Sequence, residues 1–226
     1  MPNELKFIKQ DDFSAKIEEK IKNEEKRRNL LKNFEVFHSS QLTQCSRRIL
    51  YRIAASSFKD DIFEEDTQRQ IKRKWLKFLE DGNIAKLLDI HIEPADAQYR
   101  IVGNVDAILE IEEKLVVFMA KGLSPDDFDN LKSSNPPRSD TVEIMVNMWL
   151  TEVESGILLY DNKLTNEFSI YHVSPYQPII DAVCKKCDDL ADLKIAGILP
   201  KQPYKDPNNK ECSICEFNKT CWKSQQ

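Results

Sequence analysis

The stretch between residues 99 and 121 constrains the fold most, because its second half is apolar on both faces. Successive side chains of a β-strand point to opposite sides, and in residues 115–120 both alternating sets are apolar. Such a strand has to be covered above and below, and helices provide these covers in α/β and α+β proteins. We therefore expect a hairpin of two strands, residues 99–109 and 115–120, joined through residues 112–114.

The periodicity of the remaining chain predicts the elements around this hairpin. Apolar residues at helical spacing predict helices over residues 64–80, 140–153 and 176–196, the last ending near Gly197. Residues 156–161 and 166–173 suit two further strands. This order predicts an α/β (α+β) fold in which a small mixed sheet is flanked by helices.

The N-terminal 35 residues differ in character from the rest. Ile17, Ile21, Leu30 and Leu31 stand among Lys, Glu and Arg, which predicts a charged amphipathic helix within residues 1–35, opened by Asp11 or Asp12. We expect a solvated helix packed along a narrow stripe, with a partner-binding arm as the alternative. Residues 36–226 then form a single globular domain, since 226 residues suit one domain better than two.

Composition excludes several classes of protein. The chain has 33 Lys and Arg against 38 Asp and Glu, and a formal net charge of −5 excludes a bulk-basic nucleic-acid coat but not a local basic groove. No apolar run reaches the roughly 18 residues of a membrane span. The first residues lead into a charged segment instead of the apolar region of a signal peptide. We therefore expect no membrane association and a cytoplasmic location.

The cysteines are spaced for metal binding. Cys212, Cys215 and Cys221 form a C-x2-C-x5-C cluster, and in a reducing cytosol such thiols stay available as ligands. Three thiolates need a fourth ligand to complete a tetrahedral zinc site or to hold a four-iron cluster, and Cys45 is the candidate. Ser39 or Ser40 can cap a short helix that carries Cys45 in its first turns.

A second cysteine pair has another interpretation. Cys184 and Cys187 lie where we expect a helix, residues 176–196. Thiols on the buried side of a helix pack as small hydrophobic groups, and ligation is the alternative. We therefore expect both side chains in the core.

At this point the sequence resembles a known family. Cys45 lies in the setting His-x-Ser-x-Leu-x-x-Cys-x-Arg-Arg, and together with the terminal cluster this is similar to the iron–sulfur branch of the RecB-like PD-(D/E)XK nucleases. That branch includes CRISPR-associated and phage-encoded exonucleases, and the resemblance spans about residues 36–222. It implies a restriction-endonuclease-like core with a [4Fe–4S] cluster that joins the N- and C-terminal segments. The implied ligands are Cys45, Cys212, Cys215 and Cys221, with zinc as the chemical alternative.

The same resemblance marks candidate catalytic positions. Asp106 ends a Gly-x-x-Asp motif, and Lys121 matches the end of the family's Glu-x-Lys. If the hairpin turns near residue 113, Asp106 lies opposite about position 120, and residues 119 and 121 share one face. Such nucleases hold Mg²⁺ or Mn²⁺ with carboxylates. Met119 stands at the position of the second acid, and a soft, neutral thioether does not replace a carboxylate on magnesium.

Other family positions are altered as well. The helix over residues 64–80 has no histidine, and the family's Gln-x-x-x-Tyr motif falls on Glu143 and Asn147. We therefore expect a dismantled hydrolytic site in which Asp106 and Lys121 remain as a salt bridge. The alternative is an active, metal-dependent DNA exonuclease in which Glu143 replaces the missing acid.

Basic residues on two expected helices suggest what function survives. Phosphate contacts by Lys and Arg give salt-sensitive binding that does not depend on sequence, and a solvated helix face is the alternative. The candidate DNA-binding residues are Arg47, Arg48, Arg69, Lys72, Arg73, Lys74 and Lys77. Two function classes follow: a protein that processes or holds DNA, and a structural or regulatory subunit of a larger, phage-type nucleic-acid-processing assembly in the host cytoplasm. The second class accounts better for Met119.

Overall fold

A computed structural model describes residue 22, residues 36–55 and residues 66–223. The helix expected within residues 1–35 and its capping residues therefore lie outside the described residues, apart from Lys22. The same holds for the first two residues of the helix expected over residues 64–80.

The main sheet has five strands in the order β2-β5-β6-β7-β8. The predicted hairpin forms its centre as β5 (Val105–Ile111) and β6 (Lys114–Leu123), which are antiparallel. β7 (Gly156–Asn162) runs parallel to β6, while β2 (Lys86–Ile92) and β8 (Phe168–Val173) are antiparallel edge strands. The sheet is therefore mixed, as the sequence predicts, and the parallel pair is joined through α4 (Pro125–Lys132) and α5 (Arg138–Thr151).

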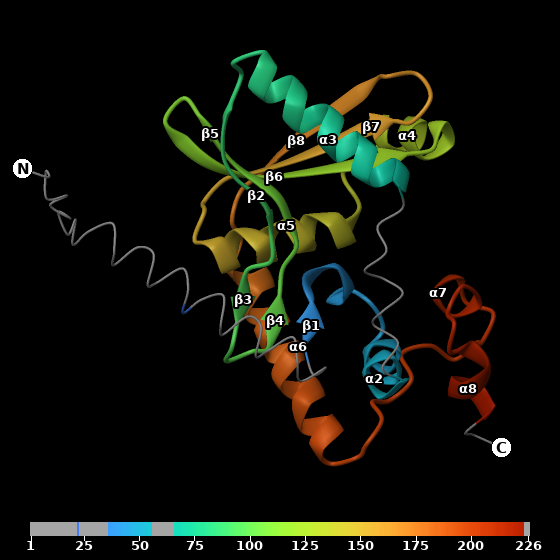
Figure 1. Cartoon of the computed structure of the whole chain (residues 1–226). Coiled ribbons are helices and arrows are strands. Elements are labelled where there is room, and N and C mark those ends of the chain that lie inside the picture. The colour runs from blue at the N-terminus through green and yellow to red at the C-terminus, as the bar shows by residue number, and fades with distance from the viewer. Residues whose placement is uncertain (1–21, 23–35, 56–65, 224–226) are drawn as a thin grey trace, which may run out of the picture.

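Strand β6 is covered on both faces, which confirms the two-sided apolar pattern. On one face Val117 and Met119 belong to an apolar cluster with residues of α4 and α5. On the other face Phe118 and Ala120 cluster with Trp75 of α3 (Asp66–Asp81). Figure 1 shows α3 and α5 on opposite sides of the sheet. The fold class is therefore α+β, with helices on both faces of a mixed sheet.

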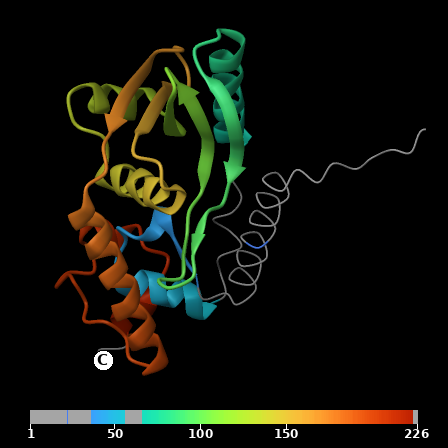
Figure 2. The same cartoon turned by 90° about the vertical axis from the view of Figure 1, so that its left-hand side faces the viewer.

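A second group of elements lies at one end of this sheet. A three-stranded sheet in the order β1-β4-β3 joins β1 (Phe37–His38), β4 (Ile101–Val102) and β3 (Ala95–Asp96). The short 3-10 helix η1 (Ser39–Gln41) leads from β1 to α2 (Ser46–Ala55), which packs with α6 (Gln177–Ile195). The short helices α7 (Lys210–Ser213) and α8 (Asn218–Lys223) lie beside α2, as both views show (Figures 1 and 2).

The buried side of α6 explains the cysteine pair. Cys184 is 8% exposed and Cys187 is 1% exposed, and both belong to the apolar core that α2 and α5 share with α6. Burial raises the pKa of the Cys187 thiol to about 12 and that of Cys184 to about 11. The packing role predicted for this pair is confirmed.

Several local predictions are wrong. Cys45 does not lie within a helix: it precedes α2, and its carbonyl accepts the amide of Ile49 at 3.1 Å. The edge strand β2, whose side chains are largely exposed, was not predicted. Because Ala107 lies opposite Phe118, the register continues to Asp106 opposite position 119, one residue from the predicted partner.

The first predicted strand is divided at Gly103. Its amide donates to the carbonyl of Pro94 at 2.8 Å, which ends the pairing of β4 before β5 begins. A Cβ atom at this position would stand 2.5 Å from Oδ1 of Asn147, so a side chain does not fit. Among the described residues, none of the helices has the length and apolar character to cross a membrane.

Candidate functional site

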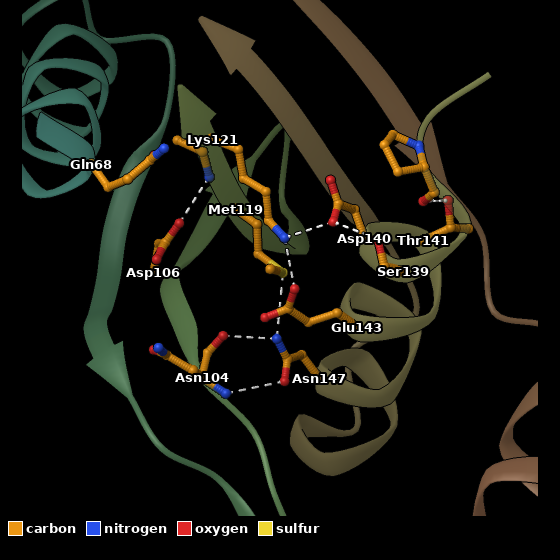
Figure 3. Close-up of polar contacts among 12 residues, drawn as sticks. Gln68, Asn104, Asp106, Met119, Lys121, Ser139, Asp140, Thr141, Glu143 and Asn147 are labelled. Atoms are coloured by element: carbon orange, nitrogen blue, oxygen red, sulfur yellow. Dashed lines mark hydrogen bonds and ion pairs between the residues drawn. The ribbon is translucent and has the colours of Figure 1, made fainter. Parts of the chain in front are cut away.

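The ends of β5 and β6 and the neighbouring helices enclose a hollow of about 180 Å³ (Figure 3). Asp106 lies in its wall and is 3% exposed. Its Oδ2 accepts the backbone amide of Ala120 at 2.8 Å, and its Oδ1 lies 2.6 Å from Nζ of Lys72 on α3. Both carboxylate oxygens are therefore engaged by donors of the chain itself.

Lys121 has different partners from those predicted. Its Nζ lies 2.9 Å from Oδ1 of Asp140 and 2.7 Å from Oε2 of Glu143, both on α5 (Figure 3). The hydroxyl of Tyr160 donates to the other oxygen of Asp140 at 2.8 Å. The expected salt bridge between Asp106 and Lys121 is thus wrong, because Lys72 takes Asp106 and the acids of α5 take Lys121.

Burial and charge shift the titration of this network. Burial raises the pKa of Glu143, and the attraction of Lys121 opposes that rise only in part. Burial alone would lower the pKa of Lys121, but Glu143 and Asp140 outweigh it and hold that pKa above its ordinary value. Three carboxylates share two lysines here, so one negative charge is left without a full counter-charge.

Met119 is built into the packing of the hollow. It is 4% exposed, and its sulfur accepts Nδ2 of Asn147 at 3.4 Å (Figure 3). The same amide group donates to the carbonyl of Asn104 at 2.8 Å, and its oxygen accepts the Asn104 amide at 3.2 Å. Met119 and Asn147, which stand at two altered family positions, therefore contact each other, and Met119 lines the hollow.

The residues of the hollow do not fit a magnesium or manganese site. Hard cations take several carboxylate or carbonyl oxygens, and Asp106 already gives one oxygen to Lys72 and the other to Ala120. Met119 adds only a thioether. Within residues 36–55 and 66–223, no group of three or more His, Cys, Asp or Glu side chains has the arrangement of a metal-ion site.

The four predicted cysteine ligands lie around one other cavity. Cys45 lines it from the start of α2, and Cys212, Cys215 and Cys221 line it from the C-terminal segment. Nε2 of Gln202 lies 3.5 Å from Sγ of Cys221 and 2.9 Å from the Cys221 carbonyl oxygen. Residues far apart in the sequence thus meet here, although their sulfurs are not gathered into a single-ion site.

Protein contacts hold the C-terminal segment against α2. Glu216 lies 2.8 Å from Nη2 of Arg48 and 2.5 Å from Nε of Arg52. The ring of Tyr51 stacks on that of Phe217 with centroids 5.4 Å apart. These contacts place the two halves of the cysteine set side by side without any bound group.

The chemistry of this cavity fits a cysteine-ligated centre. Four thiols are the usual ligand set of a [4Fe–4S] cluster. Arg47 and Arg48 line the same cavity, and their Nε atoms are buried without a hydrogen-bond partner among the described residues. Buried cationic donors beside four thiols are chemically suited to an anionic group.

Most of the candidate DNA-binding residues have partners within the protein. Arg47 is 8% exposed and Arg48 pairs with Glu216, so neither presents an open guanidinium group to solvent. On α3, Lys72 pairs with Asp106, Lys74 pairs with Asp161 at 2.8 Å, and Arg69 pairs with Asp66 at 3.2 Å. Arg73 and Lys77 are exposed on the outer side of α3.

Three residues of the charged network around the hollow were not predicted from the sequence. Asp140, Tyr160 and Asp161 were not singled out, although Asp140 and Glu143 stand three residues apart on one face of a predicted helix. Asp161 is 2% exposed and accepts Nε1 of Trp75 at 2.6 Å. Its place at the end of a buried strand was the available signal.

Comparison with known proteins bears on the fold. No protein-family model matches the chain, and no curated protein matches it. Among solved structures, SSO0001 aligns over 86% of this chain and 95% of its own, with a TM-score of 0.55 and 18% identity. The alkaline exonuclease LHK-Exo from Laribacter hongkongensis aligns over 72% and 90%, with a TM-score of 0.55 and 10% identity. The chain therefore has a fold similar to that of a known exonuclease.

Replacing Glu143 with Gln tests the charge balance of the hollow. Because burial raises the pKa of Glu143, the folded state binds this proton more tightly than the unfolded state. The associated stabilisation is complete below the unfolded pKa and is lost as the pH rises through the folded pKa. Relative to the variant, the wild type should lose about 1.4 kcal/mol of unfolding free energy for each pH unit between those two pKa values.

Urea titrations of both proteins between about pH 4 and 8 measure this difference, with the exposed Glu154→Gln as the matched control. A difference between wild type and Glu143→Gln that stays constant with pH would contradict the raised pKa.

Proposed function

We propose that this protein belongs to the iron–sulfur branch of the RecB-like nucleases, has lost hydrolytic activity, and serves as a DNA-binding or structural subunit of a nucleic-acid-processing complex. One contact carries the proposed loss of hydrolytic activity. Nζ of Lys72 lies 2.6 Å from Asp106, so an ammonium group of the chain neutralises the carboxylate that an active relative uses for metal. Met119 removes the second acidic position at the same hollow.

The loss of catalysis follows from what hydrolysis requires. A divalent ion polarises the phosphate and lowers the pKa of the attacking water. Such an ion would have to displace Lys72 from Asp106 and would find a thioether at position 119. Glu143, the first candidate for a replacement ligand, lies 2.7 Å from Lys121 and is held by it. The alternative, an active metal-dependent DNA exonuclease, needs both lysines to give up their partners.

Wild-type protein should therefore leave single- and double-stranded DNA intact in the presence of Mg²⁺ or Mn²⁺. The assay uses anaerobically purified full chain, end-labelled DNA and an Asp106→Ala control, with product length as the measurement. Cleavage that is present in wild type and lost in Asp106→Ala would establish the exonuclease alternative and sink the proposed loss of activity.

We propose that the outer side of α3 binds DNA without sequence preference. One solved structure with a similar fold is LHK-Exo in complex with dAMP, which aligns with this chain at a TM-score of 0.52. In this chain Arg73 and Lys77 stand four residues apart and are exposed, so both can reach one phosphate backbone. Lys72 and Lys74 are unsuitable for a test, because each neutralises a buried aspartate.

The double variant Arg73→Gln/Lys77→Gln should bind every DNA sequence more weakly and flatten the salt dependence of log K by about 2. Fluorescence anisotropy across a salt series measures both quantities. The exposed pair Lys201→Gln/Lys205→Gln serves as the matched control and should behave as wild type. If the wild type fails to bind DNA even at low salt, the proposed DNA binding is wrong and only the structural-subunit class remains.

We propose a [4Fe–4S] cluster as the occupant of the cysteine cavity, with zinc as the alternative. Cys45, Cys212, Cys215 and Cys221 would hold it, and such a centre ties the segment before α2 to the end of the chain when bound. Support comes from the shared cavity and from two arginines in its wall, whose buried Nε atoms have no hydrogen-bond partner within residues 36–55 and 66–223.

Anaerobic purification should give a brown protein that absorbs near ~400 nm and contains iron and sulfide. Cys45→Ser should lose most of the iron, whereas Cys184→Ala, which alters a core thiol outside the cavity, should keep it. One equivalent of zinc without iron in anaerobic wild type would overturn the cluster and leave the zinc alternative.

A further inference from the structure

We infer that Arg47 and Arg48 belong to the binding site of the anionic, cysteine-ligated centre, where their guanidinium groups act as donors and counter-charges, and not to the DNA interface. The inference rests on the proposed cluster and assigns residues to it beyond the four thiols.

Arg47 carries the inference most directly. The residue is 8% exposed and lines the cavity with the four cysteines, so its charge is withdrawn from the surface. One nitrogen, Nη2, donates to the hydroxyl of Tyr51 at 3.2 Å, and Cζ lies 5.9 Å from the centre of that ring. Its Nε has no partner among the described residues. An unpaired donor on a buried charge is costly, which indicates an acceptor in the cavity.

Arg48 repeats this arrangement from the next position of α2. Its Nη2 lies 2.8 Å from Glu216, while its Nε, like that of Arg47, is buried and has no hydrogen-bond partner in the part of the chain that the structure describes. Glu216 also pairs with Arg52. The guanidinium groups of Arg48 and Arg52 thus share one carboxylate, while the printed side-chain hydrogen bond of Arg47 goes to the neutral hydroxyl of Tyr51.

The two guanidinium groups that line the cavity complement the group proposed for it. Four thiolates around a [4Fe–4S] core carry a net negative charge, and a buried negative centre needs nearby cations or donors. Donors to the ligating sulfurs and nearby positive charge favour the reduced form, because reduction adds an electron. Gln202, with its amide nitrogen 3.5 Å from Sγ of Cys221, supplies a neutral donor that also lines the cavity.

The two possible roles of Arg47 differ in what they change. A cluster donor sets the reduction potential and leaves DNA affinity alone, whereas a phosphate contact does the reverse. Arg73 on α3 provides the matched control, because it is exposed and lies outside the residues that line the cysteine cavity.

The experiment compares wild type, Arg47→Met and Arg73→Met as full chains purified anaerobically. Spectroelectrochemical titration gives the reduction potential, and anisotropy with labelled DNA gives the affinity of the same samples. Arg47→Met should lower the reduction potential by at least about 59 mV, which for one electron corresponds to a tenfold change in the oxidised-to-reduced ratio. Its DNA affinity should stay within about twofold of wild type. Arg73→Met should weaken DNA binding and keep the wild-type potential.

A wild-type potential in iron-loaded Arg47→Met would overturn the inference, and loss of DNA affinity alone would return Arg47 to the DNA interface. If Arg47→Met fails to retain iron, Arg48→Met and the charge-conserving Arg47→Lys replace it. Arg47→Lys should show a smaller shift, because lysine keeps the charge but not the Nε donor. The iron content of the wild type is measured before any variant is compared. A wild type without iron would overturn the proposed cluster itself, which distinguishes that failure from a failure of this inference.

Discussion

The ion pair between Lys72 and Asp106 determines how the rest of the hollow is arranged. Asp106 is almost completely buried, and an ionised carboxylate in that position needs a cation and hydrogen-bond donors. Lys72 supplies the cation from α3, and the Ala120 amide supplies a donor from β6. Removing one partner of such a buried pair costs about 3–5 kcal/mol, so the pair also fastens α3 to the central hairpin.

The same principle governs the other charges of this face. Lys121 is balanced by Asp140 and Glu143, and Lys74 by Asp161. Lys72, Lys74 and Lys121 are thus each paired within the fold, whereas Lys77 of the same basic run is exposed. A second group of charged side chains lies at the other end of the molecule, where α2, α7 and α8 lie side by side in both views (Figures 1 and 2). There the guanidinium groups of α2 stand beside four thiols and two glutamates, Glu211 and Glu216.

The predictable part of this structure is the part that leaves a periodic pattern. The two apolar faces of residues 115–120 predicted the buried central strand, and the helical spacing of residues 176–196 predicted the core position of Cys184 and Cys187. Partners across the fold were not predictable, because a run of lysines on α3 does not show which carboxylate each one meets. Lys72 and Arg47 were assigned to DNA for that reason, and the structure withdraws both from the surface.

The central claim is that the ammonium group of Lys72 takes the place of a divalent metal at Asp106. A crystal of the protein soaked in Mn²⁺ tests it directly, because manganese scatters anomalously and its position can be located without any activity. The account predicts that no anomalous peak lies beside Asp106 and that Lys72 remains within hydrogen-bond distance of its carboxylate. A manganese peak between Asp106 and Glu143, with Lys72 displaced, would contradict it.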